Sequence, residues 1–259
     1  MLRSVLFALA FYVTTAVFVI GGSPLLFGPR AWAMAGLRTH ARACLWLLRV
    51  ICNTRVEVRG LEHLPAEPAL IAAKHQSAWD TFALIPLFRD PALVMKAELG
   101  RIPFYGWFSR KFEHILVERG QGARALRKMV SDAQARSKAG RDILIFPEGT
   151  RQAPGAPADY KPGVAALNNA LDGRTVPVAL NSGLYWPRRT LRRYPGTIIV
   201  ELLPPLPAGL KRQAYQAALE TALERASDAL LDEAAAGATP PPTVEAALHH
   251  RAVDRDHQG

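Results

Sequence analysis

Residues 4–29 carry no charged side chain, and a continuous apolar run, Val5–Ile20, lies near their centre. Folded as a helix, residues 5–27 would extend about 35 Å, which is enough to cross the hydrocarbon core of a bilayer. Gly21, Gly22 and Pro24 favour a break near the end of this helix, so a hairpin that only dips into the membrane fits the same pattern. Residues 1–27 are therefore predicted to form a membrane-anchoring helical segment.

The next segment, residues 28–54, alternates apolar and basic positions at nearly helical spacing. This pattern predicts an amphipathic helix at the level of the lipid headgroups, with Trp32 and Trp46 as interfacial anchors. A helix that covers a protein core has the same pattern, so the spacing alone leaves the two alternatives open. The basic residues of this segment are Arg30, Arg38, Arg42 and Arg49.

Basic residues are more frequent after the apolar segment than before it, where only Arg3 stands. This asymmetry places the rest of the chain on the cytoplasmic side of the membrane. A cleaved signal peptide is the alternative, because Ala31-Trp32-Ala33 fits a small-residue cleavage site. The length of the apolar stretch and the charge of Arg30 beside that site argue against cleavage.

From residue 55 onward, short apolar segments alternate with amphipathic ones. Several expected strands are continuously apolar, which is typical of a sheet with helices on both faces. We therefore predict an α/β domain over residues 55–231, with a mainly parallel sheet flanked by helices. Pro177 interrupts one strand and predicts an edge position or a bulge there. Strands are expected at Val56–Val58, Ala69–Ala73, Ala92–Met95, Ile115–Val117, Asp142–Phe146, Thr175–Leu180 and Thr197–Leu203, and helices at Thr81–Phe88, Ala123–Lys138 and Lys211–Leu231.

Beyond Asp232 the chain changes to alanine and glycine, followed by the run Pro240–Pro242 and a polar end. A segment with so few apolar residues buries little surface to offset the conformational entropy that ordering removes. Residues 232–259 are therefore predicted to be a disordered tail.

The charge balance favours an anionic partner, since 32 lysines and arginines stand against 22 acidic residues, giving a net charge of +10. Nucleic acid, a phosphate-bearing substrate, an acidic carrier protein and an anionic membrane all suit this charge. No nucleic-acid-binding module is recognisable, so we expect no nucleic acid as partner. Cys44 and Cys52 are too few for a disulfide scaffold and lack metal-ligand spacing, so we expect no metal site.

The segment after the expected strand Ala69–Ala73 holds a histidine and an aspartate five residues apart. On one continuous helix His75 and Asp80 would point about 140° apart. With His75 in a turn and Asp80 in the first helical turn, the carboxylate can instead fold back toward the imidazole. A carboxylate that accepts one ring N–H fixes the histidine tautomer, and the other ring nitrogen then serves as a general base. A capping box with Ser77 as the N-cap is the alternative.

Two further segments place candidate binding residues at expected strand ends, where ligands bind in open α/β sheets. In Phe146–Arg151, Gly149 allows close approach of backbone to a ligand, and Arg151 supplies a fork for phosphate or carboxylate. Lys96 and Arg119 also follow strands, so the three basic side chains are expected to converge on a phosphate group. A polar loop and solvated loop charges are the alternatives for these segments.

Taken in order, these segments resemble the glycerolipid acyltransferase family, in particular the 1-acyl-sn-glycerol-3-phosphate acyltransferases of bacterial membranes. The likeness covers four sequence blocks between residues 74 and 178 and extends more loosely to about residue 231. Four blocks in the family's order are far more specific than any one of them. The matching residues are His75 and Asp80 in the first block, Lys96, Leu99, Pro103, Gly106 and Arg119 in the second, Phe146–Arg151 in the third and Val176–Val178 in the fourth.

The chain departs from the family pattern at two positions. Lys74 stands where the family usually has asparagine, and Glu118 stands where it usually has aspartate. Neither position is one of the catalytic groups that the resemblance implies, but the change at Lys74, directly before His75, bears on donor or acceptor preference.

The resemblance implies direct transfer of a fatty acyl group without an acyl-enzyme. His75, oriented by Asp80, would take the proton from the sn-2 hydroxyl of 1-acyl-sn-glycerol 3-phosphate, a lysophospholipid. The oxygen would attack the thioester of acyl-CoA or acyl-acyl carrier protein, giving phosphatidic acid. The family implies no metal and no cofactor besides this thioester co-substrate. Substrate contacts are implied for Lys96, Arg119, Glu148, Gly149, Thr150 and Arg151.

The resemblance also implies a location and partners. The expected site of action is the inner (cytoplasmic) membrane of a bacterium, with the catalytic domain on its cytoplasmic side. Membrane lipid and, for one of the two donors, acyl carrier protein are the expected macromolecular partners. An interfacial enzyme with a basic surface suits both anionic lipid and an acidic carrier.

Three alternatives stay open at this point. Lyso-ornithine lipid is another acceptor within the family, and because it has no phosphate, Arg119→Ala should affect it less. A hydrolase with Ser77 as nucleophile lacks the Gly-x-Ser-x-Gly elbow of α/β-hydrolases. A non-catalytic basic membrane-associated protein would explain the charge and the anchor but not the presence of His75, Asp80, Glu148 and Arg151 together.

Overall fold

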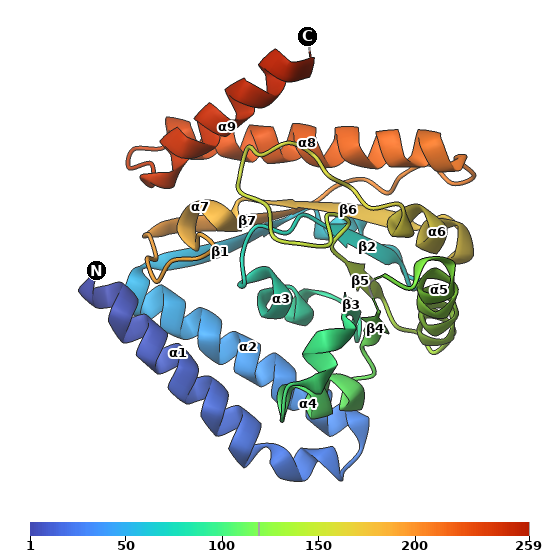
Figure 1. Ribbon diagram of the computed structural model, residues 1–259. Helices are drawn as coiled ribbons and strands as arrows, with labels where there is room; N and C mark the ends of the chain where they lie inside the picture. Colours follow the sequence, from blue (N-terminus) through green and yellow to red (C-terminus); the bar gives the residue numbers. More distant parts are fainter. Residues whose placement is uncertain (119, 259) are drawn as a thin grey trace.

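A sheet of seven strands separates two layers of helices in the computed structural model, which describes residues 1–118 and 120–258 (Figure 1). The strand order is β1-β7-β6-β2-β5-β3-β4, and every neighbouring pair is parallel except β6 and β7. This confirms the predicted α/β class with a mainly parallel sheet. The strands are β1 (Thr54–Arg59), β2 (Leu70–Ala73), β3 (Ala92–Lys96), β4 (Ile115–Val117), β5 (Ile143–Ile145), β6 (Thr175–Leu180) and β7 (Gly196–Leu202).

Side chains of β2 alternate between two cores, one on each face of the sheet. Leu70 and Ala72 belong to the core under α5, α6 and α8, whereas Ile71 and Ala73 belong to the core under α2 and α3. Because helices cover both faces, every residue of this strand is buried and apolar. The helices are α1 (Leu2–Gly21), α2 (Arg30–Cys52), α3 (Asp80–Ala83), α4 (Tyr105–Lys111), α5 (Gly122–Lys138), α6 (Gly163–Ala170), α7 (Ser182–Tyr185), α8 (Arg212–Ala236) and α9 (Thr243–Gln258).

Short 3-10 turns fill several connections, and one of them shortens a predicted helix. The expected helix Thr81–Phe88 ends as α3 at Ala83 and continues as a 3-10 turn, because Pro86 has no N–H to extend the helical hydrogen bonds. The 3-10 turns lie at Ser23–Leu26, Leu61–His63, Ile85–Leu87 and Ala97–Arg101.

Helices α1 and α2 lie side by side along the lower layer in Figure 1. Within the described residues, α1 is the one helix long and apolar enough to cross a membrane. One face packs inward through Phe7, which is fully buried, while Val5, Leu9, Val13 and Val17 on the other face are at least half exposed. The chain reverses direction after Gly21, where the sequence predicted a break.

Helix α2 combines features of both alternatives for this segment. Cys44 and Leu48 are buried in the core beneath the sheet, so one face of the helix covers the domain. Trp32 and Trp46 are each 62% exposed on the other side. The start of α2 is attached to the sheet layer by an ion pair between Arg30 and Asp90, with 2.6 Å between the charged atoms. The interfacial role of the tryptophans stays a prediction.

The edge position predicted from Pro177 is wrong, because β6 lies in the middle of the sheet between β7 and β2. Proline is tolerated there because the ladder between β6 and β7 begins only at Val178, one residue later. The missing N–H of Pro177 therefore falls outside that ladder, while its carbonyl accepts the N–H of Leu203.

The disorder predicted for residues 232–259 is also wrong over the described part of that range. Helix α8 continues to Ala236, and α9 follows the proline run and packs against α7 and α8 (Figure 1). Val244 and Ala247, three residues apart, are buried on one face of α9. The ion pair of Arg251 with Asp232 holds the two helices together at 2.6 Å. The average composition concealed this short apolar face, which needs only a helical spacing.

Candidate active site

The imidazole of His75 and the carboxylate of Asp80 meet in the turn between β2 and α3. His75 Nδ1 lies 3.0 Å from Asp80 Oδ2, and Asp80 is fully buried while the His75 side chain is 12% exposed. An ionised carboxylate only accepts hydrogen bonds, so Nδ1 donates and Nε2 is left as the basic nitrogen. The predicted turn geometry is therefore present, with the carboxylate folded back toward the ring.

Three further donors fix the orientation of the Asp80 carboxylate. Oδ2 also accepts the backbone N–H groups of Gln76 and Ser77, each at 2.8 Å, and Oδ1 accepts the hydroxyl of Ser182 at 2.6 Å. Charge-assisted bonds to backbone amides replace the water that burial removes from the carboxylate. Ser182 comes from α7, more than a hundred residues further along the chain, and no sequence signal marked it.

The capping-box alternative is partly realised without displacing the contact between His75 and Asp80. The contact between the Ser77 N–H and Asp80 is that of a capped helix start, but the same carboxylate oxygen also accepts from His75. The Ser77 hydroxyl donates to the Trp186 carbonyl at 2.8 Å and accepts the N–H of Trp79. It is fully buried, so the geometry does not suit the nucleophile of a hydrolase.

The loop after β5 encloses His75 from the adjoining strand. The ring of Phe146 stacks on the imidazole, with 4.1 Å between ring centres and 15° between planes. The N–H of Gln152 donates to the His75 carbonyl at 2.7 Å, and the N–H of His75 donates to Glu148 at 2.8 Å. Backbone and ring of His75 are both held by this loop.

Among the predicted substrate-binding residues, Glu148 lies inward and contacts His75 and Lys74. Its side chain is fully buried, with one oxygen on the His75 N–H and the other 2.6 Å from the ammonium of Lys74. Gly149 adopts a positive φ of 66°, which lets the loop turn sharply after Glu148. Thr150 and Arg151 are both exposed. Only these last two side chains of the block are open to solvent.

The basic residues predicted to bind phosphate follow neighbouring strands. Strands β2, β5, β3 and β4 are adjacent and parallel, so the segments that follow them share one edge of the sheet. Half-buried Lys96 ends β3, and exposed Arg151 follows β5 at that same edge. Arg119 lies outside the described residues. The topology thus places Lys96 and Arg151 on the side of the sheet that carries His75.

An apolar cavity of about 270 Å³ lies beside the turn that holds His75 and Asp80, enclosed by α1, α2, α3 and α4. Ala78 and Thr81 of the segment that follows His75 contribute to its wall. Burial lowers the pKa of His40 in this wall, so the ring is neutral at pH 7 and contacts Thr15 at 3.1 Å. Sequence reasoning could not locate the cavity because four separate helices build it. Larger side chains that line it include Phe11, Phe18, Leu37, Phe82 and Phe108.

Comparison with known proteins identifies relatives of this chain. A family model described as Acyltransferase matches residues 55–181. A 1-acyl-sn-glycerol-3-phosphate acyltransferase of Pseudomonas aeruginosa is 36% identical over 211 residues, which cover 80% of this chain and 81% of the relative. A lyso-ornithine lipid O-acyltransferase of the same organism is 33% identical over 106 residues, or 40% of each chain.

A solved structure supports the fold. The crystal structure of the 1-acyl-sn-glycerophosphate acyltransferase PlsC from Thermotoga maritima superposes with a TM-score of 0.73 over 88% of this chain and 96% of that chain. The two sequences are 23% identical, so this likeness concerns the architecture alone. It confirms the α/β fold.

Proposed function

The chain belongs to the acyltransferase family that includes the 1-acyl-sn-glycerol-3-phosphate acyltransferases, and on that premise we propose that it acylates a lysophospholipid. The acceptor is the sn-2 hydroxyl of 1-acyl-sn-glycerol 3-phosphate, and the product is phosphatidic acid. The donor is the thioester of acyl-CoA or acyl-acyl carrier protein. The observation that carries this proposal is the 3.0 Å contact between His75 Nδ1 and buried Asp80, beside an apolar cavity.

His75 Nε2 removes the proton of the acceptor hydroxyl while the hydroxyl oxygen attacks the thioester carbonyl carbon. The tetrahedral intermediate collapses by breaking the carbon–sulfur bond, and the imidazolium returns the proton to the leaving thiolate. Asp80 stabilises the imidazolium that forms in between. General-base catalysis of this kind contributes about 10²–10⁴-fold, so positioning of the two lipids supplies much of the remaining acceleration.

We assign binding of the acceptor phosphate to Arg151 and Lys96, together with Arg119 and the hydroxyl of Thr150. For Arg151, Thr150 and Lys96 the support is their place after adjacent parallel strands on the His75 side of the sheet, and for Arg119 it is the resemblance of the sequence block that contains it. A guanidinium presents a planar fork that matches phosphate oxygens, whereas a lysine acts as a point charge. The step as written consumes only the two substrates, so we propose that it needs no metal and no cofactor. Activity should persist after treatment with EDTA.

The apolar cavity suits the hydrocarbon tail of an acyl chain. Its wall is made of apolar side chains with a few neutral polar groups, so a methylene chain meets no charge there. Each methylene that leaves water stabilises the bound state by about 0.8 kcal/mol, or roughly fourfold in affinity. Affinity should therefore rise with chain length until the cavity is full.

The exposed apolar face of α1 supports membrane association of the enzyme. Val5, Leu9, Val13 and Val17 form a stripe that is not covered by the rest of the described chain, and Trp32 and Trp46 are exposed on the adjoining helix. With a net charge of +10, the surface suits anionic lipid headgroups. We propose a bacterial inner membrane as the location, with the catalytic domain on the cytoplasmic side and acyl carrier protein as one candidate donor partner.

An acceptor panel tests the proposed function directly. The membrane-associated protein is assayed for thiol release from acyl-CoA, and for loss of acyl-acyl carrier protein, with lysophosphatidate, lyso-ornithine lipid, other lysophospholipids, glycerol 3-phosphate or water as acceptor. We expect release that depends on lysophosphatidate and disappears in His75→Ala. Release of thiol with water alone would support a hydrolase. A preference for lyso-ornithine lipid would indicate a lyso-ornithine lipid O-acyltransferase instead. Absence of turnover with every acceptor would refute the proposal.

A further inference from the structure

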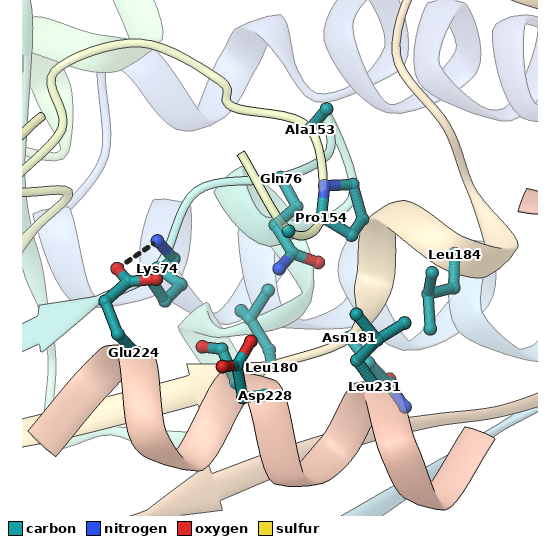
Figure 2. Close-up of a pocket in the computed structure, with 12 residues that line it drawn as sticks. Lys74, Gln76, Ala153, Pro154, Leu180, Asn181, Leu184, Glu224, Asp228 and Leu231 are labelled. Carbon is teal, nitrogen blue, oxygen red and sulfur yellow. Dashed lines mark hydrogen bonds and ion pairs between the residues drawn. The ribbon is translucent and has the colours of Figure 1, made fainter. Parts of the chain in front are cut away.

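Lys74, directly before His75, places its ammonium group between two carboxylates. The Nζ atom lies 2.6 Å from Glu148 Oε1, 2.7 Å from Oε1 of Glu224 and 3.3 Å from the hydroxyl of Tyr160. Figure 2 shows the side chain of Lys74 reaching Glu224 on α8. The Lys74 side chain is only 5% exposed, a burial that lysine rarely reaches unless it is paired.

The ion pair between Lys74 and Glu148 is connected to the backbone of His75. Glu148 Oε1 contacts Lys74, while Glu148 Oε2 accepts the His75 N–H at 2.8 Å. The three residues thus form a continuous series of contacts in which one carboxylate is shared between an ammonium group and a backbone amide. Asp80 fixes the ring of His75, and Glu148 fixes its main chain.

The charges of this cluster depend on one another. Burial raises the pKa of Glu148, and the charge of Lys74 together with its hydrogen bond opposes that rise. Burial lowers the pKa of Lys74, but the charges and hydrogen bonds of Glu148 and Glu224 together raise it by more, so the net change in the pKa is upward. Lys74 is therefore charged at neutral pH. Removing it would leave a carboxylate buried without a counter-charge, which must then protonate, move toward water or draw water inward.

We propose that Lys74 is a positioning residue that acts through Glu148 to hold the backbone of His75 in its catalytic place. The inference rests on the proposed function, in which His75 is the general base. In this proposal Glu148 holds the backbone of His75 and does not bind the substrate. The positioning role also gives a physical reason for a lysine where the family pattern has asparagine, since here the charge lies within reach of both Glu148 and Glu224.

The test compares Lys74→Met with the double variant Lys74→Met/Glu148→Gln and with Glu148→Gln alone. Methionine fills the space of the lysine stem without the charge. In the single variant Glu148 loses its counter-charge, whereas in the double variant a neutral amide still offers an oxygen to the His75 N–H. We expect Lys74→Met to lower kcat about 10- to 100-fold, the loss typical of misplacing a catalytic group by about 1 Å. The KM for lysophosphatidate should change less than about twofold, because the side chains of Lys74 and Glu148 are buried, at 5% and 0% exposed.

The double variant should recover kcat to within about threefold of Glu148→Gln alone, since non-additive effects are the mark of residues in direct contact. If Lys74 had a purely structural role, both variants that carry Lys74→Met would be less stable than the wild type, and adding Glu148→Gln would not restore kcat. Three results would overturn the proposal: kcat of Lys74→Met within twofold of the wild type, a loss confined to KM, or no recovery in the double variant.

Two controls keep the result interpretable. Asp90→Asn breaks the ion pairs with Arg30 and Arg141 at the opposite edge of the sheet, so it should lower the melting temperature while leaving kcat within about twofold. If Lys74→Met does not fold, Glu148→Gln is compared with Glu148→Met, which retains no acceptor for the His75 N–H. Equal kcat in that pair would overturn the proposal. The wild-type protein in the same assay separates the acyltransferase function from the positioning role of Lys74. If the wild type shows no turnover, the acyltransferase function is refuted. If the wild type turns over and the variants do not behave as expected, only the positioning role is refuted.

Discussion

Replacement of Asp80 by asparagine should separate the charge of this residue from its geometry. The amide has nearly the shape of the carboxylate, and the surrounding donors determine how it sits. The position of Oδ2 faces His75 Nδ1 and the N–H groups of Gln76 and Ser77, so an amide nitrogen there would meet three donors. The position of Oδ1 faces the Ser182 hydroxyl, which can accept as well as donate. The amide oxygen is therefore held toward His75, and the histidine tautomer is retained.

This arrangement fixes the expected size of the effect. In serine-protease triads, Asp→Asn reverses the tautomer of the histidine and lowers kcat about 10⁴-fold. Here only the charge is lost. A hydrogen bond to a charged group contributes about 1.5–3 kcal/mol and a neutral one about 0.5–1.5 kcal/mol, so the difference is about 1–2 kcal/mol. Asp80→Asn should therefore lower kcat by about 5- to 30-fold.

The assay is thiol release at saturating lysophosphatidate and acyl-CoA, with near-UV circular dichroism and the melting temperature as checks of the fold. A loss of 10³-fold or more in a folded variant would refute the reasoning, because it would require the amide to turn its nitrogen toward His75 despite the two backbone N–H groups. Wild-type kcat would be equally damaging, since it would remove any role for the Asp80 charge in stabilising the imidazolium.

Three other predictions concern the acceptor, the acyl chain and the pH dependence of stability. Arg151→Ala should raise the KM for lysophosphatidate about 10- to 100-fold through the loss of one charge-assisted bond, and should affect lyso-ornithine lipid less; an equal change for both lipids would contradict the phosphate contact. Gly36→Leu projects into the cavity wall, where a Cβ would meet only the flexible end of Leu25 at 3.1 Å, so kcat/KM should fall for long-chain donors and be kept for short-chain donors. A parallel loss at all chain lengths would argue against an acyl site in this cavity. Burial lowers the pKa of His114 to about 3, so below pH 6.5 the unfolded chain binds a proton that the folded chain does not. Stability should therefore fall with decreasing pH by up to about 1.4 kcal/mol per pH unit, or about 2 kcal/mol at pH 5. His114→Asn, which retains an acceptor for the Leu93 N–H, should show a smaller difference between denaturation midpoints at pH 7.5 and pH 5, and an unchanged difference would disprove this contribution.

Local patterns in the sequence were sufficient for the main elements of the fold. The alternation that buries Leu70 and Ile71 on opposite faces of β2 is a property of neighbouring residues, and so is the helical stripe of α5. The contact between His75 and Asp80 could also be predicted from the sequence, since only a turn and the start of a helix separate the two residues. Composition failed where a local pattern was weak: the buried positions Val244 and Ala247 were enough for α9 to pack.

What the sequence by itself determined is therefore the α/β class, the order of its elements and the contact between His75 and Asp80, because each depends on spacings of a few residues. Only the tertiary structure decided which way Glu148 faces, which hydroxyl supports Asp80, where the apolar cavity lies and that β6 is central. Those features join residues as far apart as Lys74 and Glu224, 150 positions along the chain. Contacts over such distances follow from the packing of whole helices and strands on a sheet, and no short-range periodicity encodes them.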